Sequence, residues 1–228
     1  MRLTKSRPYR MQRRAEQVDE TRERITQATV LLHTTVGPAH TSIAAVAEEA
    51  GVTRLTVYRH FADLDALFVA CRAHWVAQNP QPDTAAWIEI PDLEDRARRA
   101  FGELYSWYRD HADELYPIYR DAQAMPLSAQ QATAAGNRQL SAALIAGQLG
   151  SISEREGRLL SAVAGHLVDF WTWRSLAVQQ GLDDRAAVST AVRLLMAMID
   201  GTRNRPVSPT RSVGRREAGR AANSPDDE

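Results

Sequence analysis

The sequence is poor in cysteine, with Cys71 as its single example among 228 residues. One cysteine allows no disulfide within the chain and no paired-cysteine zinc pattern. Long apolar runs are also missing: none approaches the ~18 residues that a membrane-spanning helix requires, and the basic N-terminus lacks the apolar stretch of a signal peptide. We therefore expect a cytoplasmic protein without membrane contact, bound metal or cofactor.

Catalytic motifs are missing as well. The sequence contains no Gly-x-Ser-x-Gly, no His-Glu-x-x-His, no Gly-rich phosphate loop and no Cys-x-x-Cys pair. Its carboxylates are scattered over the solvent-facing sides of the expected helices, where they suit solvation better than acid–base chemistry. We therefore expect no enzymatic activity.

Charge is balanced overall but unevenly distributed. The net charge is zero, with 44% hydrophobic and 25% charged residues, as in ordinary soluble globular proteins. The first 14 residues nevertheless carry six basic side chains and no acidic one: Arg2, Lys5, Arg7, Arg10, Arg13 and Arg14. Basic arms of this kind often bind nucleic acid, although a merely solvated tail is the alternative.

Apolar residues recur at three- and four-residue steps from Val18 onward, and no alternating run predicts a strand. We therefore expect an all-α protein. The pattern predicts four helices up to about residue 78, a proline-containing connector, and further helices near 93–111, 113–123, 128–149, 154–180 and 183–199. The expected division is a flexible basic arm (1–17), a helix-turn-helix domain (18–62), a helical body (63–200) and a disordered tail (201–228).

Residues 42–61 are typical of a helix, a tight turn and a second helix. Gly51 lies at the break, where the chain needs a left-handed conformation that other residues resist. Thr53, Arg54 and Thr56 then stand at the exposed N-terminal end of the second helix. In helix-turn-helix proteins this end reaches the base edges of the major groove.

The residue types at these positions suit contact with DNA. Arg54 can donate two hydrogen bonds to guanine, a contact worth about 1–3 kcal/mol of discrimination, although an isolated arginine would be an ordinary surface residue. Thr53 and Thr56 can bond base edges or phosphate. Tyr58 and His60 lie one turn later, where they can donate to phosphate, although Tyr58 fits the domain core equally well.

This stretch resembles the DNA-binding domain of the tetracycline-repressor (TetR) family. The resemblance rests on Ala-Gly-Val-Thr at 50–53, Tyr-Arg-His-Phe at 58–61 and Asp-Leu-Asp-Ala-Leu-Phe at 63–68. It implies an N-terminal three-helix helix-turn-helix domain and a C-terminal helical domain for ligand binding and dimerisation. It further implies a repressor that binds palindromic operator DNA as a homodimer and is released by a small-molecule effector.

The expected DNA-contacting residues are Thr41, Ser42, Thr53, Arg54, Leu55, Thr56, Tyr58 and His60. Two positions depart from the family pattern. Leu55 replaces a small residue and could touch a thymine methyl group, and Leu64 replaces a lysine that contacts phosphate. One missing charge lowers the salt dependence of binding by about one unit. The basic arm could compensate from the neighbouring minor groove.

The helical body holds the expected dimer and ligand surfaces. Helices 154–180 and 183–199 have broad apolar stripes that suggest more than one packing partner, and family resemblance makes them the dimer interface. Aromatic residues with a few polar groups suit a small-molecule site, although such stripes are often ordinary core. The expected ligand-binding residues are Phe101, Tyr105, Tyr108, Met125, His166, Phe170 and Trp173, with Tyr105 and His166 as polar contacts.

Two other functions remain open at this point. A helical interaction module could keep this architecture after losing specific DNA binding, which the leucine at position 64 slightly favours. A transcriptional activator would have the same sequence features as a repressor. In either regulator, the helix from Asp63 to about Gln78 joins the two domains, so a change in its tilt would move the recognition helices.

Overall fold

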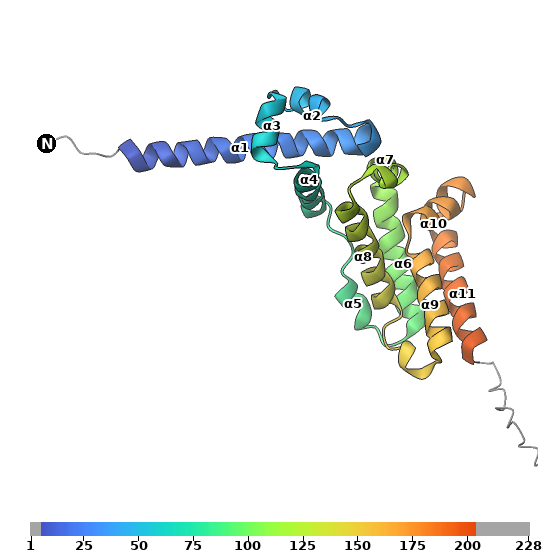
Figure 1. Cartoon of the computed structure of the whole chain (residues 1–228). Helices are drawn as coiled ribbons and strands as arrows, with labels where there is room; N and C mark the ends of the chain where they lie inside the picture. The colour runs from blue at the N-terminus through green and yellow to red at the C-terminus, as the bar shows by residue number, and fades with distance from the viewer. Residues whose placement is uncertain (1–5, 204–228) are drawn as a thin grey trace, which may run out of the picture.

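The computed structural model describes residues 6–203, which are mainly helical and contain no strand (Figure 1). The expected all-α class is confirmed. The α-helices are α1 (Ser6–Thr35), α2 (Ile43–Glu49), α3 (Arg54–His60), α4 (Leu64–Gln78), α5 (Thr84–Ile88), α6 (Leu93–Asp110), α7 (Ala112–Arg120), α8 (Leu127–Leu144), α9 (Glu154–Leu167), α10 (Phe170–Arg174) and α11 (Asp184–Arg203). Within this range no helix is long and apolar enough to cross a membrane.

The first four helices form a small unit, which we call the head. In Figure 1, α2 and α3 lie on one side of α1, and α4 lies on the other. They share one apolar core, in which Ile25, Val57 and Phe61 are each no more than 2% exposed. The fully buried Ile25 lies near the middle of α1, so the N-terminal half of that helix extends beyond the head.

The turn between α2 and α3 is set by local hydrogen bonds. Ser42 caps α2, its hydroxyl oxygen accepting from the Ala45 amide at 3.1 Å. At the other end Gly51 has φ of 64°, which confirms the predicted left-handed conformation. The Gly51 N–H donates to the Glu48 carbonyl at 3.0 Å, and the N–H of residue 52 donates to that of residue 47 at 2.8 Å. These two bonds form a Schellman motif, which fixes where α3 begins.

The remaining helices, α5–α11, form the body. The central helix α6 packs against α8, α10 and α11 in an aromatic-rich core. Two buried α6 hydroxyls donate to backbone carbonyls at the end of α9: Tyr105 to Leu167 at 2.9 Å and Tyr108 to Val168 at 2.8 Å.

The expected helix 154–180 is broken after Leu167, where these two hydroxyls donate. A continuous helix would use the carbonyls of residues 167 and 168 for amides four residues later. Here the tyrosines donate to them, and Asp169 starts α10 by accepting from the Trp171 amide at 2.8 Å. A π-helical turn, Ser175–Gln179, follows α10.

The expectation of a flexible arm over residues 1–17 is wrong for residues 6–17, because α1 begins at Ser6. The chain has no proline or glycine between Tyr9 and Val36, and Pro8 falls in the first turn, where a missing N–H is tolerated. At the other end α11 continues to Arg203. The rest of the expected disordered tail lies outside the described residues.

Polar contacts join the head to the body. The Asp121 carboxylate, after α7, accepts from the Ala39 amide at 3.1 Å, and Arg120 donates to the Val36 carbonyl at 2.8 Å. Gly37 lies directly between these two contacts with φ of 97°, and a Cβ atom there would overlap the Asp121 carboxylate. Glycine at this position therefore permits the close approach of α1 to α7.

The two left-handed glycines should differ in how much a methyl group destabilises the fold. We expect Gly51→Ala to lower the free energy of unfolding by about 1–2 kcal/mol, because its Cβ meets no neighbour and only the backbone is strained. Gly37→Ala should lower it further, because the overlap with Asp121 is added. The control Gly102→Ala, inside α6 with open space around it, should change stability little or raise it by up to about 1 kcal/mol. Denaturant titration measures all three, and equal losses at positions 37 and 51 would contradict the account.

Candidate nucleic-acid interface and ligand cavity

Helix α3 exposes a face to solvent that carries both polar and apolar side chains. Its first turn is held by Thr53, whose hydroxyl oxygen accepts from the Thr56 amide at 3.2 Å and lies 2.9 Å from the Thr56 hydroxyl. Arg54 is exposed, Leu55 is 70% exposed and Tyr58 is 56% exposed. The two threonines therefore organise the start of the helix, and the other three side chains are available to a partner.

Tyr58 lies outside the core, so the alternative that placed it among the buried residues is wrong. His60, at the end of α3, is half-buried, and its carbonyl accepts from the Arg22 guanidinium of α1 at 2.5 Å. The same guanidinium lies 4.2 Å from the centre of the Phe61 ring. Burial, Arg22 and Arg59 together lower the pKa of His60. At neutral pH its ring is therefore mainly an uncharged hydrogen-bonding group.

The two hydroxyls before α2 have local roles. Ser42 caps the helix but remains exposed, whereas half-buried Thr41 donates to the Gly37 carbonyl at 2.9 Å. Beyond α3, Leu64 is 51% exposed at the start of α4. Most of the residues expected to contact DNA are thus accessible to solvent. Thr41 is the least available of them, because it is half-buried and its hydroxyl already donates within the protein.

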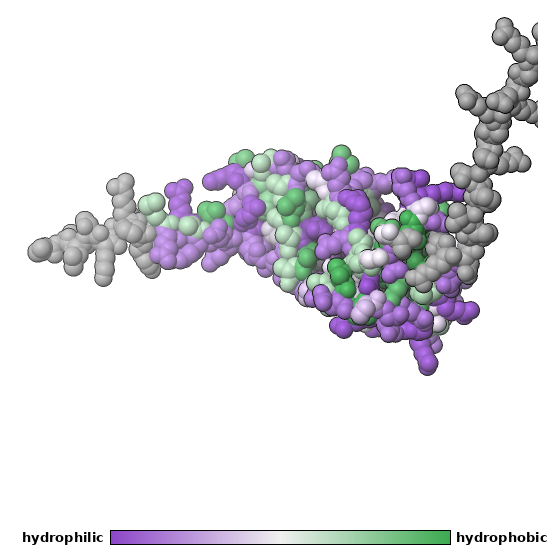
Figure 2. All heavy atoms as spheres, turned by 90° about the horizontal axis from the view of Figure 1, so that it is seen from below, coloured by the Kyte–Doolittle hydropathy of each residue, from purple (hydrophilic) through white to green (hydrophobic). Residues whose placement is uncertain are grey.

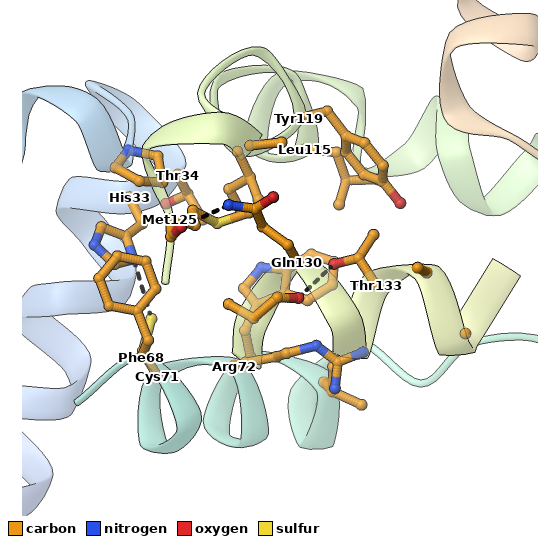
Figure 3. A pocket seen from close by; sticks show the side chains of 18 of the residues that line it. His33, Thr34, Phe68, Cys71, Arg72, Leu115, Tyr119, Met125, Gln130 and Thr133 are labelled. Atoms are coloured by element: carbon orange, nitrogen blue, oxygen red, sulfur yellow. Dashed lines mark hydrogen bonds between the residues drawn. The ribbon is translucent and has the colours of Figure 1, made fainter. Parts of the chain in front are cut away.

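A cavity of about 390 Å³ lies where the head meets the body (Figure 3). Helices α1, α4, α7 and α8 contribute most of its walls, and α6, the start of α10 and several connecting segments add the rest. Aromatic and aliphatic side chains dominate these walls, and a few uncharged polar groups are interspersed. The polar groups include Thr34, Gln123, Gln130, Thr133 and Asn137. Size and lining both suit a small organic molecule.

Most of the expected ligand-binding residues lie elsewhere. Of the seven, Met125 lines this cavity. Five others are core residues that are at most 2% exposed: Phe101, Tyr105, Tyr108, Phe170 and Trp173. His166 is exposed, and its ring nitrogen lies 3.3 Å from the Thr172 hydroxyl. Tyr105 and His166 are therefore not polar contacts of this cavity, because backbone carbonyls and solvent already satisfy them.

The sequence contained a weak signal for the lining of this cavity. The stripe of α4 includes Leu67, Phe68, Cys71 and Trp75. Leu67 alone of these belongs to the head core, whereas the other three line the cavity. A stripe wider than one core requires was therefore a sign of a second surface on this helix.

The wall formed by α1 and α4 contains two buried titratable groups, His33 and Cys71. His33 and Cys71 face each other, with Nδ1 and Sγ 3.5 Å apart, and the His33 ring lies 4.6 Å from that of Phe68. Burial lowers the pKa of His33 to about 4 and raises that of Cys71 to about 12. Both groups are therefore neutral at pH 7. Among residues 6–203, no three His, Cys, Asp or Glu side chains are grouped closely enough to hold a metal ion.

Comparison with known proteins connects the head to one family. Residues 25–71 match the family model described as bacterial regulatory proteins, tetR family. The matched segment begins in the middle of α1 and ends within α4, so it contains the whole of α2 and α3. No curated protein matches the chain.

Solved structures were also found that align with most of this chain. A TetR-like transcriptional regulator from Rhodococcus sp. RHA1 is 19% identical, with a TM-score of 0.52 over 79% of this chain and 96% of that chain. A TetR transcription regulator from Haloarcula marismortui ATCC 43049 is 19% identical, with a TM-score of 0.48 over 81% of this chain and 98% of that one. NalD from Pseudomonas aeruginosa, the secondary repressor of the MexAB-OprM multidrug efflux pump, is 23% identical, with a TM-score of 0.45 over 80% and 96%. At these identities the Rhodococcus likeness supports the fold alone.

The neutral His33 should make stability depend on pH. Because its pKa is about 4 in the folded chain and about 6.5 when unfolded, the unfolded state binds more protons between these values, and stability falls as pH falls through this window. We expect this group to remove about 2 kcal/mol between pH 7 and pH 4.5. His33→Phe keeps a ring beside Phe68 but cannot titrate, so its stability should fall less over the same range. Chemical denaturation at both pH values tests this, and equal losses in parent and variant would contradict it.

Proposed function

The chain belongs to the TetR family of bacterial regulatory proteins, and we propose that it represses transcription by binding a palindromic operator as a homodimer. We further propose that a small effector in the cavity between head and body releases it from DNA. The observation that carries this proposal is the geometry of α3. Its start is fixed by the Gly51 turn, and Arg54, Leu55 and Tyr58 project from it into solvent.

Dimerisation follows from what α3 can reach. One short recognition helix reads only a few base pairs, and helix-turn-helix dimers bind two half-sites about 34–36 Å apart. We propose that the outer faces of α9 and α11 form the dimer interface, since these helices lie side by side at one edge of the body in Figure 1. Leu159 on α9 and Leu194 on α11 remain 46% and 52% exposed. Unpaired apolar residues on neighbouring helices are typical of such an interface.

The expected interface stripe divides between two roles. Leu160, Val192 and Leu195 are no more than 2% exposed and belong to the core of the protomer. The half-buried Val163, Val188 and Met196 lie at the border of that core. The proposed interface therefore uses the outward residues, and the breadth of the stripe reflects two packing surfaces.

Release by an effector requires the two conformations to differ in affinity for it. Shifting a population from 1:99 to 99:1 takes about 5.5 kcal/mol of differential binding. Helix α4 is the proposed lever, because Leu67 packs in the head core while Phe68, Cys71 and Trp75 line the cavity. An effector that changes the position of these cavity residues would also move α4 within the head.

The proposal predicts that base readout depends on Arg54. A duplex should first be selected from random DNA with the parent protein. We expect Arg54→Ala to weaken binding to that duplex at least about fivefold, the lower end of one lost base contact. Arg138→Ala is the matched control, an exposed arginine on α8 in the body, and should bind as the parent does.

The selection also distinguishes the alternatives. Failure to enrich any sequence, by a folded protein, would favour an interaction module without specific DNA binding. Unchanged affinity of a folded, dimeric Arg54→Ala variant would contradict the proposed role of α3. The effect of the selected duplex on transcription from a linked promoter distinguishes a repressor from an activator.

The projecting part of α1 is a candidate for a second contact with DNA. Its exposed surface is predominantly hydrophilic (Figure 2). Because the chain is helical from residue 6 onward, with a diameter of about 10–12 Å, this part of the arm does not fit a minor groove about 6 Å wide. We propose instead that the basic end of this helix contacts phosphates beside the half-site.

Replacing Arg10, Arg13 and Arg14 with glutamine tests this contact while keeping the length of α1. We expect affinity for the selected duplex to fall and its salt dependence to become shallower, by about 0.9 units of slope per lost phosphate contact. Gel-shift titrations at several salt concentrations give both quantities. Glu16→Gln and Glu20→Gln in the same helix form the control and should not make the slope shallower. An unchanged slope in the arginine variant would reject the contact.

A further inference from the structure

We infer that the cavity between head and body takes an organic acid: an apolar or aromatic body whose carboxylate pairs with Arg72 at the cavity mouth. The inference rests on the proposed function, because it names the chemical class of the effector. Its argument starts from which polar groups of the cavity are already paired and which are not.

Arg72 is the unpaired cation of the cavity. It lies on α4, lines the cavity and is exposed, which places it at the mouth. Figure 3 shows its side chain extending from α4 toward Thr133 on α8. Among the described residues it forms no ion pair or side-chain hydrogen bond, whereas most arginines of α6 are paired with carboxylates. A guanidinium in this position can offer a carboxylate two parallel hydrogen bonds.

The other charged group of the cavity, Asp169, is committed. One carboxylate oxygen accepts from the Trp171 amide at 2.8 Å, and the other accepts from the Asn137 side-chain amide at 3.0 Å. Both of its oxygens are thus engaged, one at the N-terminus of α10 and one with Asn137, by neutral donors that leave its negative charge in place. Burial and Asp169 raise the pKa of Tyr119, a lining residue, to about 12, so its hydroxyl is neutral at pH 7. Since His33 and Cys71 are neutral as well, Arg72 is the charged lining group that has no hydrogen-bond partner among the described residues.

A second unpaired donor supports the same assignment. Trp107, another lining residue, is 8% exposed, and its indole N–H has no acceptor within the part of the chain that the structure describes. A buried donor without a partner is unfavourable by about 1–3 kcal/mol. Both unpaired groups, Arg72 and Trp107, are donors that lack acceptor atoms. A ligand rich in acceptors, such as a carboxylic acid, supplies them.

The rest of the lining defines the body of the ligand. Phe68, Trp75 and Trp171 provide aromatic walls, and Leu115, Ile118 and Met125 provide aliphatic ones. Aromatic walls also suit organic cations. Arg72 would repel a cation at the mouth, however, and both Asp169 oxygens already accept hydrogen bonds from the protein. The structure therefore favours the acid over the cation.

The test uses the full-length protein without DNA and three probes of one shape: naphthalene-2-carboxylate, the neutral naphthalene-2-carboxamide and the cation 2-naphthylmethylammonium. Binding is followed by quenching of tryptophan fluorescence, because Trp75, Trp107 and Trp171 line the cavity. We expect the acid to bind about tenfold more tightly than the amide, as one charge-assisted contact allows. Arg72→Gln should remove this preference, Arg72→Lys should keep part of it, and the control Arg138→Gln should keep all of it.

Each other outcome overturns the inference. Equal binding of acid and amide, or a preference that survives in Arg72→Gln, would leave a ligand cavity without selectivity for acids. Tighter binding of the ammonium probe would show a cation site. If none of the probes binds, this effector class is wrong. None of these results bears on operator binding, which the selected duplex tests separately, so failure of this inference and failure of the proposed function are distinguishable.

Discussion

The structure depends on one constraint: α4 must satisfy two apolar surfaces at once. Leu67 is buried in the head core, and Phe68, Cys71 and Trp75, on the same side of the helix, form a wall of the cavity. Packed interiors do not deform continuously, so a shift that suits one surface disturbs the other. Helix α1 is held in the same way, with Ile25 in the head core and His33 at the cavity. Two helices therefore connect the head to whatever occupies the junction.

The junction is bonded differently from the two cores that it joins. Trp75 donates to Glu114 at 2.6 Å, and Asp121 accepts from the Ala39 amide, so polar contacts hold α4 and α1 to the body. The exposed Trp75–Glu114 contact is individually weak, whereas Asp121 is buried. The exposed contact can therefore be exchanged for another at a small change in free energy, while the apolar cores remain intact. A cavity between two well-packed cores, joined in part by contacts that can be exchanged, is compatible with a protein that switches between two conformations.

Sequence reasoning succeeded where structure is decided locally. Gly51 acts on atoms within five residues of itself, and the α2–α3 turn was predicted from it. The break after α9 could not be predicted, because the hydroxyls that donate there come from α6, some 60 residues away in the chain. The lining of the cavity could not be predicted for the same reason, because its walls come from helices that are far apart in the sequence. The clustered aromatic residues that were expected to bind a ligand are mostly core residues. Contacts of DNA and ligand with the proposed residues stay predictions.

The head also suggests how affinity and sequence preference are divided in the proposed complex. With Leu64 in place of a lysine and Leu55 70% exposed on α3, the recognition surface is less basic and more apolar than the family pattern implies. Apolar contact with thymine methyl groups discriminates between bases but adds little salt-dependent affinity. In the proposed complex, the basic residues concentrated at the N-terminal end of α1 would supply the positive charge that position 64 lacks. Because α1 is one continuous helix that also lines the cavity through His33, an effector that shifts it would move both contributions together. Release would then require no separate signal to the basic end of the helix.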